Sequence, residues 1–143
     1  MMVKHFEFFV STTDEYDTAY IGDIVKNYVA KSGVKNGLVS VITAHTSCGI
    51  IVTEPLDCIL SDLKELLSNT IPEDANYSHA HFLHTYGRTS ANSYGHLRSI
   101  FTGNHALVSL VDGELAVGAA QEIVFMEFDG PQQRKVYVDI IGE

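Results

Sequence analysis

The chain has 143 residues, a formal net charge of −9 and 45% hydrophobic residues. This length and apolar content suit one domain with a single core, which we assign to residues 1–143. The acidic balance and the scattered Lys and Arg residues argue against a nucleic-acid partner. No apolar run approaches the roughly 20 residues that span a bilayer, and the N-terminus lacks the apolar core of a signal peptide. We therefore expect a cytoplasmic protein without a membrane partner.

The N-terminal segment predicts a strand followed by a helix. Val3 to Ser11 is rich in Phe and Val and is typical of a strand. Apolar residues then recur at helical spacing over residues 19–31, and Gly33 follows the last of them, where helices often stop. The sequence therefore predicts a first helix that ends just before Gly33.

Two β-rich runs, at residues 38–42 and 49–53, flank His45. The residues between His45 and the second run are small and polar, which indicates a bend that exposes this histidine. Pro55 suits the first turn of a helix, and Leu residues continue at helical spacing as far as Leu67. The sequence therefore predicts a second helix directly after the second run.

The remainder of the chain predicts a long loop, a short helix and several strands. Residues 75–93 are polar and aromatic without a clear period, and loops of this length are usually functional or mobile. A short helix is predicted over 94–101. Asp112-Gly113 is a strong hairpin signal. Strands are predicted at 105–111, 123–128 and 135–141. This order predicts an α+β fold with a mainly antiparallel sheet or a β-sandwich-like core, two main helices and a short third.

Seven histidines, unevenly placed, are the most unusual feature of the sequence. Neutral imidazole is the commonest metal ligand, and three protein ligands with an open position are typical of a catalytic zinc site. The spacing matches no compact zinc motif, and the alternative is that the loop histidines are solvated or make local hydrogen bonds. The predicted ligands of a divalent cation, zinc or magnesium, are His45, His79, His84 and His96, with His81 as a competing loop residue.

Two carboxylates and one amide are candidates for catalytic roles. Glu54 ends an apolar strand and could orient a histidine, act as a base or bind a cation; the alternative is a favourable charge at a helix N-terminus. Glu127 and Phe128 point to opposite faces of a strand, so one of them is buried or faces the site. Gln121 follows small residues that would let a ligand approach closely, unless they form a simple turn.

Five ordered segments resemble the YjbQ-type family, which is often labelled secondary thiamine-phosphate synthase. They are His45-Thr46-Ser47-Cys48-Gly49-Ile50, Pro72-Glu73-Asp74, Asn92-Ser93-Tyr94-Gly95-His96-Leu97, Leu115-Ala116-Val117-Gly118-Ala119-Ala120-Gln121 and Glu127-Phe128-Asp129-Gly130-Pro131. The resemblance runs from about the first strand to the C-terminus. It implies a compact α+β fold and a homotrimer with sites near the subunit interfaces.

The resemblance also implies functional positions. His45, Asn92, His96, Gln121, Glu127 and Asp129 match motif residues of the family, and Glu54 falls where many members carry a polar pair. Ser47-Cys48 replaces Thr-Ala, Arg88 stands where many members have a further histidine, and Ala120 replaces a Trp. These departures leave the third metal ligand open between His79 and His84.

The family label implies that a pyrimidine diphosphate is joined to a thiazole phosphate, which needs cations to neutralise the diphosphate. Few basic residues lie near the motifs, so this activity is expected to be secondary. The leading hypothesis is a metal-dependent enzyme, a transferase or a hydrolase, acting on a small phosphorylated substrate. In it Glu54 or Glu127 acts as base, and Asn92 and Gln121 orient the substrate. The alternatives are a trimeric metal- or small-molecule-binding protein without turnover and a structural trimer.

Overall fold

The computed structural model describes residues 1–79 and 92–143. Its elements follow the predicted order closely, with three helices and eight strands in the described part of the chain. In chain order they are β1 (Met2–Ser11), β2 (Asp17–Tyr20), α1 (Gly22–Ser32), β3 (Gly37–Thr43), β4 (Cys48–Thr53), α2 (Asp57–Thr70), α3 (Ser93–Thr102), β5 (His105–Val111), β6 (Glu114–Leu115), β7 (Glu122–Glu127) and β8 (Gln133–Gly142).

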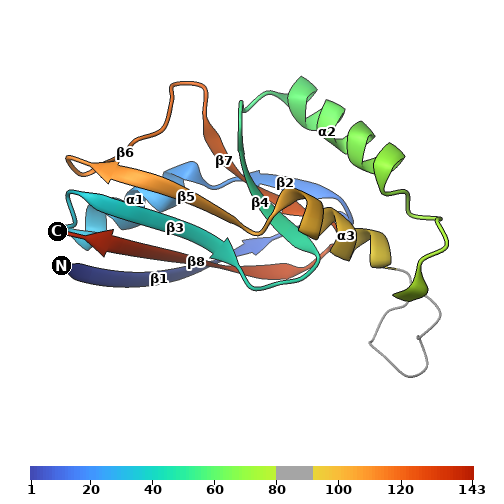
Figure 1. Ribbon diagram of the computed structural model, residues 1–143, viewed down its shortest axis with the longest axis horizontal. Coiled ribbons are helices and arrows are strands. Elements are labelled where there is room, and N and C mark those ends of the chain that lie inside the picture. Colours follow the sequence, from blue (N-terminus) through green and yellow to red (C-terminus); the bar gives the residue numbers. More distant parts are fainter. Residues whose placement is uncertain (80–91) are drawn as a thin grey trace.

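The larger sheet has five strands in the order β1-β8-β3-β5-β6, all paired antiparallel. Residues alternate strictly between its two faces, as the period of a strand requires. Val136, Val138 and Ile140 point into the core, whereas Lys135 and Tyr137 point to the other face. Because β1 and β8 pair along their whole length, the two chain termini lie side by side at one end of the molecule (Figure 1).

The smaller sheet, in the order β2-β7-β4, is covered on both faces. Ile123 and Phe125 of β7 pack into the core that α1 and the larger sheet share, whereas Val124 and Met126 pack against Leu67 and other apolar residues of α2. A strand buried on both sides has a continuous apolar sequence instead of an alternating one, and this explains the run in β7. In Figure 1, α2 and α3 lie at the end of the molecule opposite the termini.

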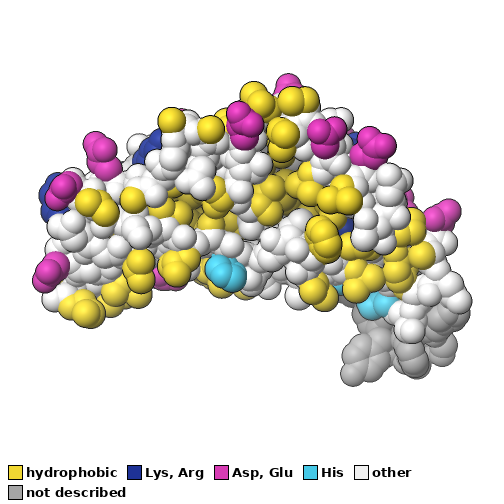
Figure 2. Space-filling model, turned by 45° about the horizontal axis from the view of Figure 1, so that its top comes forward, with side chains coloured by type: hydrophobic (Ala, Val, Ile, Leu, Met, Phe, Trp, Pro, Cys, Tyr) yellow, Lys and Arg dark blue, Asp and Glu magenta, His cyan; other side chains and the backbone are white. Residues whose placement is uncertain are grey.

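The predicted α+β class with a mainly antiparallel sheet is confirmed, and one boundary differs. Residues 17–20 form strand β2, which pairs with β7, and the first helix begins only at Gly22. None of the helices in residues 1–79 and 92–143 is long and apolar enough to cross a membrane. On the surface, Figure 2 shows hydrophobic side chains gathered over the middle of one face, with acidic side chains along its outer edge.

Candidate functional site

Helix α3 is held close to strand β4 by small residues. A Cβ atom on Gly49 would lie 2.3 Å from Oγ1 of Thr102, so only glycine permits this approach. Oγ of Ser99 also donates a hydrogen bond to the carbonyl oxygen of Cys48, at 2.6 Å. These contacts fix the helix that carries His96 against the strand that follows His45.

A cavity of about 410 Å³ lies at this junction, and His45 and His96 both line it. The two histidines come from the β3–β4 connection and from α3. Most other lining side chains are small or neutral and polar; they include Thr43, Thr46, Ser99 and Asn104. The structure therefore brings together two of the predicted site residues around one cavity.

Backbone contacts determine which nitrogen of each ring carries a proton. The backbone N–H of Lys135 donates to Nε2 of His45 at 3.0 Å, so Nε2 is unprotonated and the neutral ring carries its proton on Nδ1. Nδ1 of His96 lies 2.9 Å from the carbonyl oxygen of Thr46; a carbonyl only accepts, so Nδ1 donates and Nε2 of the neutral ring keeps a free lone pair. Both neutral rings are therefore held as the Nδ1–H tautomer, but opposite groups are left free: the Nδ1–H donor of His45 and the Nε2 lone pair of His96.

The environment of His45 favours its neutral form. Burial lowers the pKa of this imidazole, and the positive charges of Arg134 and Lys135 lower it further, while the charge of Glu127 partly opposes them. A neutral His45 with its proton on Nδ1 can donate a hydrogen bond to an oxygen atom of a ligand, as neutral histidines do in some enzymes.

The predicted base Glu127 is completely buried and takes part in an ion pair. Arg134 donates from Nη2 to Oε2 of Glu127 at 2.7 Å and from Nε to Oε1 at 2.9 Å. Thr12 donates to Oε1 at 2.8 Å, and the backbone N–H groups of Phe128 and Asp129 donate to Oε2. Glu127 therefore lies within a saturated network and acts on the site through its neighbours.

Arg134 connects this network to the histidine segment, a role that the sequence analysis missed. Its Nη2 also donates to Oγ of Ser47, two residues after His45, at 2.9 Å. One signal was present in the sequence: Arg134 precedes Val136, Val138 and Ile140 at a spacing of two, and this places the guanidinium on the buried face of β8.

The predicted metal ligands meet only in part. The rings of His79 and His96 lie 5.3 Å apart between centroids, and His79 Nδ1 is buried without a hydrogen-bond partner in the described part. The described residues contain no group of three or more His, Cys, Asp or Glu side chains able to hold a metal ion. Nε2 of His45 is occupied by a backbone N–H, so the residues seen here do not fit the expected three-ligand centre. His81 and His84 lie outside the described residues.

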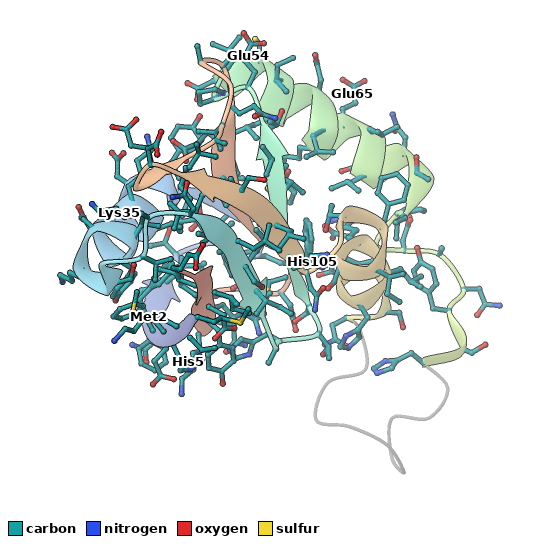
Figure 3. The ribbon with its side chains drawn as sticks, turned by 60° about the vertical axis from the view of Figure 1, so that its left-hand side comes forward. Met2, His5, Lys35, Glu54, Glu65 and His105 are labelled. Atoms are coloured by element: carbon teal, nitrogen blue, oxygen red, sulfur yellow. The ribbon has the colours of Figure 1, made fainter. Side chains whose placement is uncertain are left out.

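The three remaining predicted residues lie in different places. Asn92 Nδ2 donates to Oδ2 of Asp129 at 2.9 Å, and its buried Oδ1 has no partner among the described residues. Glu54 and Gln121 are both exposed. Glu54 follows Thr53 and Gln121 precedes Glu122, at the end of the β4–β7 pair where Thr53 lies opposite Glu122. This end lies about 17 Å from Cys48, given a rise of roughly 3.4 Å per residue. Figure 3 shows Glu54 far from His105, the residue after Asn104 of the cavity lining. Glu54 and Gln121 are therefore not brought to the histidines.

Comparison with known proteins identifies the family. The model of the family described as UPF0047 protein YjbQ-like matches residues 6–143, and the chain belongs to this family. A UPF0047 protein from Methanocaldococcus jannaschii is 30% identical over 139 residues, which cover 96% of this chain and 94% of the relative. A YbjQ-like protein of unknown function from Sulfolobus solfataricus has the same fold, with a TM-score of 0.92 at 27% identity and 99% coverage of both chains.

A second solved structure agrees with this assignment. The uncharacterised conserved protein of the YjbQ/UPF0047 family from Clostridium acetobutylicum superposes with a TM-score of 0.85 at 31% identity, covering 95% of this chain and 99% of that one. The resemblance carried by the five motifs is therefore confirmed at the level of the family.

Proposed function

We propose that this chain is an enzyme that uses His45 and His96 as a paired donor and acceptor for acid–base chemistry on a small polar substrate. The observation that carries the proposal is that the backbone occupies Nε2 of His45 and Nδ1 of His96, which leaves one donor and one acceptor free on two rings that line one cavity. In this proposal, Nδ1–H of His45 polarises a substrate oxygen, and the Nε2 lone pair of His96 accepts a proton.

A phosphorylated substrate remains part of the proposal, with thiamine-phosphate synthesis as the reaction that the family label implies. The cavity lining within the described residues contains no Lys or Arg, and a phosphate group needs positive charge or several N–H donors. Arg88 lies outside the described residues. The preference for a phosphorylated substrate is tested by comparing KM for the phosphorylated and the non-phosphorylated form of one substrate; a lower KM for the phosphorylated form would support it.

A divalent cation, zinc or magnesium, is a second part of the proposal. His79 and His96 are the described imidazoles closest to sharing one, and a metal held there would act as a Lewis acid. Metal analysis of the purified protein, followed by chelation and re-addition of Zn²⁺ or Mg²⁺, tests this. Activity that survives chelation would remove the metal from the proposal and leave the histidine pair.

We also propose that copies of the chain assemble into a trimer through the open face of the larger sheet. No helix covers this face in the described part, and large apolar side chains on it stay exposed. These are Val3, Phe9, Leu38, Leu107, Val111 and Ile141. Exposed apolar area of this kind is typical of an interface. Sedimentation should give a trimer for the native chain and a smaller species for Leu107→Lys.

The experiment that tests the function compares matched histidine variants. Thiamine-phosphate synthesis and hydrolysis of p-nitrophenyl phosphate are measured for the native chain, His45→Gln, His96→Gln and His5→Gln. Loss of a positioned acid or base costs about 100-fold or more in rate, so the first two variants should lose activity. His5 is exposed and hydrogen-bonded to Asp139 at 2.6 Å, on the face proposed for assembly, so His5→Gln should retain activity when sedimentation shows that it assembles like the native chain. Full activity of His96→Gln would contradict the proposal.

A binding protein without turnover is the second candidate. The observation that favours it is the neutral lining of the histidine cavity, which offers hydrogen bonds but no described carboxylate to assist a base. Such a protein would retain ligands without converting them. This candidate would be favoured over the enzyme if calorimetry shows that the native chain binds a ligand, that His45→Gln does not, and that no product forms.

A further inference from the structure

A buried arginine occupies the opposite face of α3 from the histidine cavity. Arg98 follows His96 by two positions, which corresponds to about 200° around a helix. It is only 3% exposed. Its guanidinium lies over the ring of Tyr94, 4.9 Å from the centroid, and donates from Nε and Nη2 to the carbonyl oxygen of Ile71, at 3.2 and 2.9 Å.

Among the described residues, this buried cation has no carboxylate partner within 4.0 Å. The ion pairs of the described residues, within 4.0 Å, do not include Arg98. Residues 80–91, which the structure does not describe, contain no Asp or Glu, so they cannot supply one. Removing a charge from water without a paired counter-charge is costly. The charge of Arg98 is therefore available to an anionic group from outside the chain.

Arg98 lines a cavity of about 370 Å³ together with Tyr16, which carries a second unused donor. The hydroxyl of Tyr16, which also lines this cavity, is buried and has no hydrogen-bond partner among the described residues. Burial raises the pKa of Tyr16 to about 12, so the hydroxyl keeps its proton at neutral pH. Buried hydroxyl groups almost always have a partner, and this one points to a missing ligand.

The rim of the same cavity carries the opposite charge. Asp14, Glu15 and Glu73 line it with exposed carboxylates, and Lys64 stands among them. Burial raises the pKa of Glu15, and the neighbouring charges of Glu73 and Asp129 raise it further, against the smaller lowering effect of Arg98. Mutual repulsion between these carboxylates would be relieved by an ammonium group.

The arrangement of charges disfavours simpler ligands. A plain anion that reached Arg98 would have to pass the rim carboxylates, and a plain cation or metal ion would meet Arg98 and Lys64. A molecule with a negative group at one end and a positive group close by satisfies both regions.

We propose that this cavity binds a free α-amino acid. The carboxylate of the amino acid accepts hydrogen bonds from Arg98 and from the hydroxyl of Tyr16, and its ammonium group lies between Glu15 and Glu73 at the rim. This site is separate from the histidine cavity, because the two cavities share no lining residue.

The test uses the full chain and heteronuclear NMR. The twenty standard amino acids are added one at a time to about 10 mM, a concentration that fills sites with millimolar Kd. Acetate and methylamine serve as probes for the two charged halves. The expected result is that at least one amino acid shifts the Nε–H resonance of Arg98 and the backbone amide of Tyr16, and binds at least about tenfold more tightly than either half.

Two kinds of variant decide where the ligand binds. Tyr16→Phe removes a hydroxyl that has no partner in the described fold, so the chain should stay folded while binding weakens at least about tenfold. Glu73→Gln should also weaken binding, whereas Tyr28→Phe, whose hydroxyl donates to the carbonyl of Glu7 elsewhere, should not. The proposal is overturned if no amino acid shifts Arg98, if acetate binds as tightly as the best amino acid, or if Tyr16→Phe binds normally.

Discussion

Two buried arginines, Arg134 and Arg98, lie in environments of opposite character. Arg134 is 6% exposed and makes three hydrogen bonds to the carboxylate of Glu127. Arg98 is equally buried, yet its polar contacts within the described residues are two hydrogen bonds to one backbone carbonyl. The first cation is compensated inside the chain, and the second is not.

This difference separates a charge that maintains the structure from a charge that is available for binding. A buried ion pair with saturated hydrogen bonds loses stability when one partner is removed, because the other is left uncompensated. A buried cation without a counter-ion leaves no orphaned charge when it is removed. Matched substitutions of the two arginines therefore distinguish the two roles directly.

The largest expected effect is that of Arg134→Met. This change leaves the carboxylate of Glu127 buried without its cation, and breaking such pairs typically costs about 3–5 kcal/mol. We expect the free energy of unfolding, measured by urea denaturation, to fall by this amount. Adding Glu127→Gln should recover part of the loss, because the glutamine is neutral. A double variant that is less stable than Arg134→Met alone would contradict this account.

Arg98→Met should cost clearly less. It removes the two hydrogen bonds to the carbonyl of Ile71 and the contact with Tyr94, which are worth about 1–2 kcal/mol together. It also removes an uncompensated buried charge, and this offsets part of the loss. Urea denaturation of Arg98→Met, measured in the same way as for Arg134→Met, tests this expectation. A loss as large as that of Arg134→Met would mean that Arg98 is structural.

Much of the fold was predictable because its strands and helices have strong local patterns. The predicted strand at 105–111 coincides with β5, where buried and exposed residues alternate strictly. Strand β2 was missed because its four residues, Asp17–Tyr20, carry no such pattern and are defined by pairing with β7, more than 100 positions away. Long-range pairing of this kind cannot be inferred from local periodicity.

The candidate site was predictable in its residue types but not in its chemistry. The histidine count and the motifs pointed to His45 and His96, and both line one cavity. Their tautomers depend on the backbone of Lys135 and Thr46, 90 and 50 positions away from the rings they contact. The pairing of Glu127 with Arg134 required the arrangement of β7 and β8, which no local signal provides.

A third prediction concerns pH, because the compensated arginine still acts on His45. The pKa of His45 is lowered in the folded chain by burial and by Arg134, so below the ordinary value near 6.5 the unfolded chain binds more protons. The contribution of His45 to stability is therefore lost as pH falls through about 6.5 towards the lower folded pKa. His45→Gln should remove this loss in urea denaturation measured between about pH 5 and pH 8.

The control for this prediction is His5→Gln, at an exposed site opposite Asp139, five residues along β8 from Arg134. As pH falls, the native chain should lose stability relative to His45→Gln. The difference in free energy of unfolding between the native chain and His5→Gln should not change in this way. A difference for His45→Gln that is constant across this pH range would refute a lowered pKa.

The smallest expected effect is that of Lys135→Gln on the ring of His45. The positive charge of Lys135 is the last of the causes that lower the pKa of His45, and its Nζ is partly exposed, 3.6 Å from Glu7. Solvent screens such charges, so removal should raise the pKa only slightly in an NMR titration. The proton should stay on Nδ1, because the hydrogen bond to Nε2 comes from the backbone N–H, which the substitution retains. A change of tautomer in Lys135→Gln would show that the side chain, and not the backbone, orients the ring, and the donor role of His45 would then have to be abandoned.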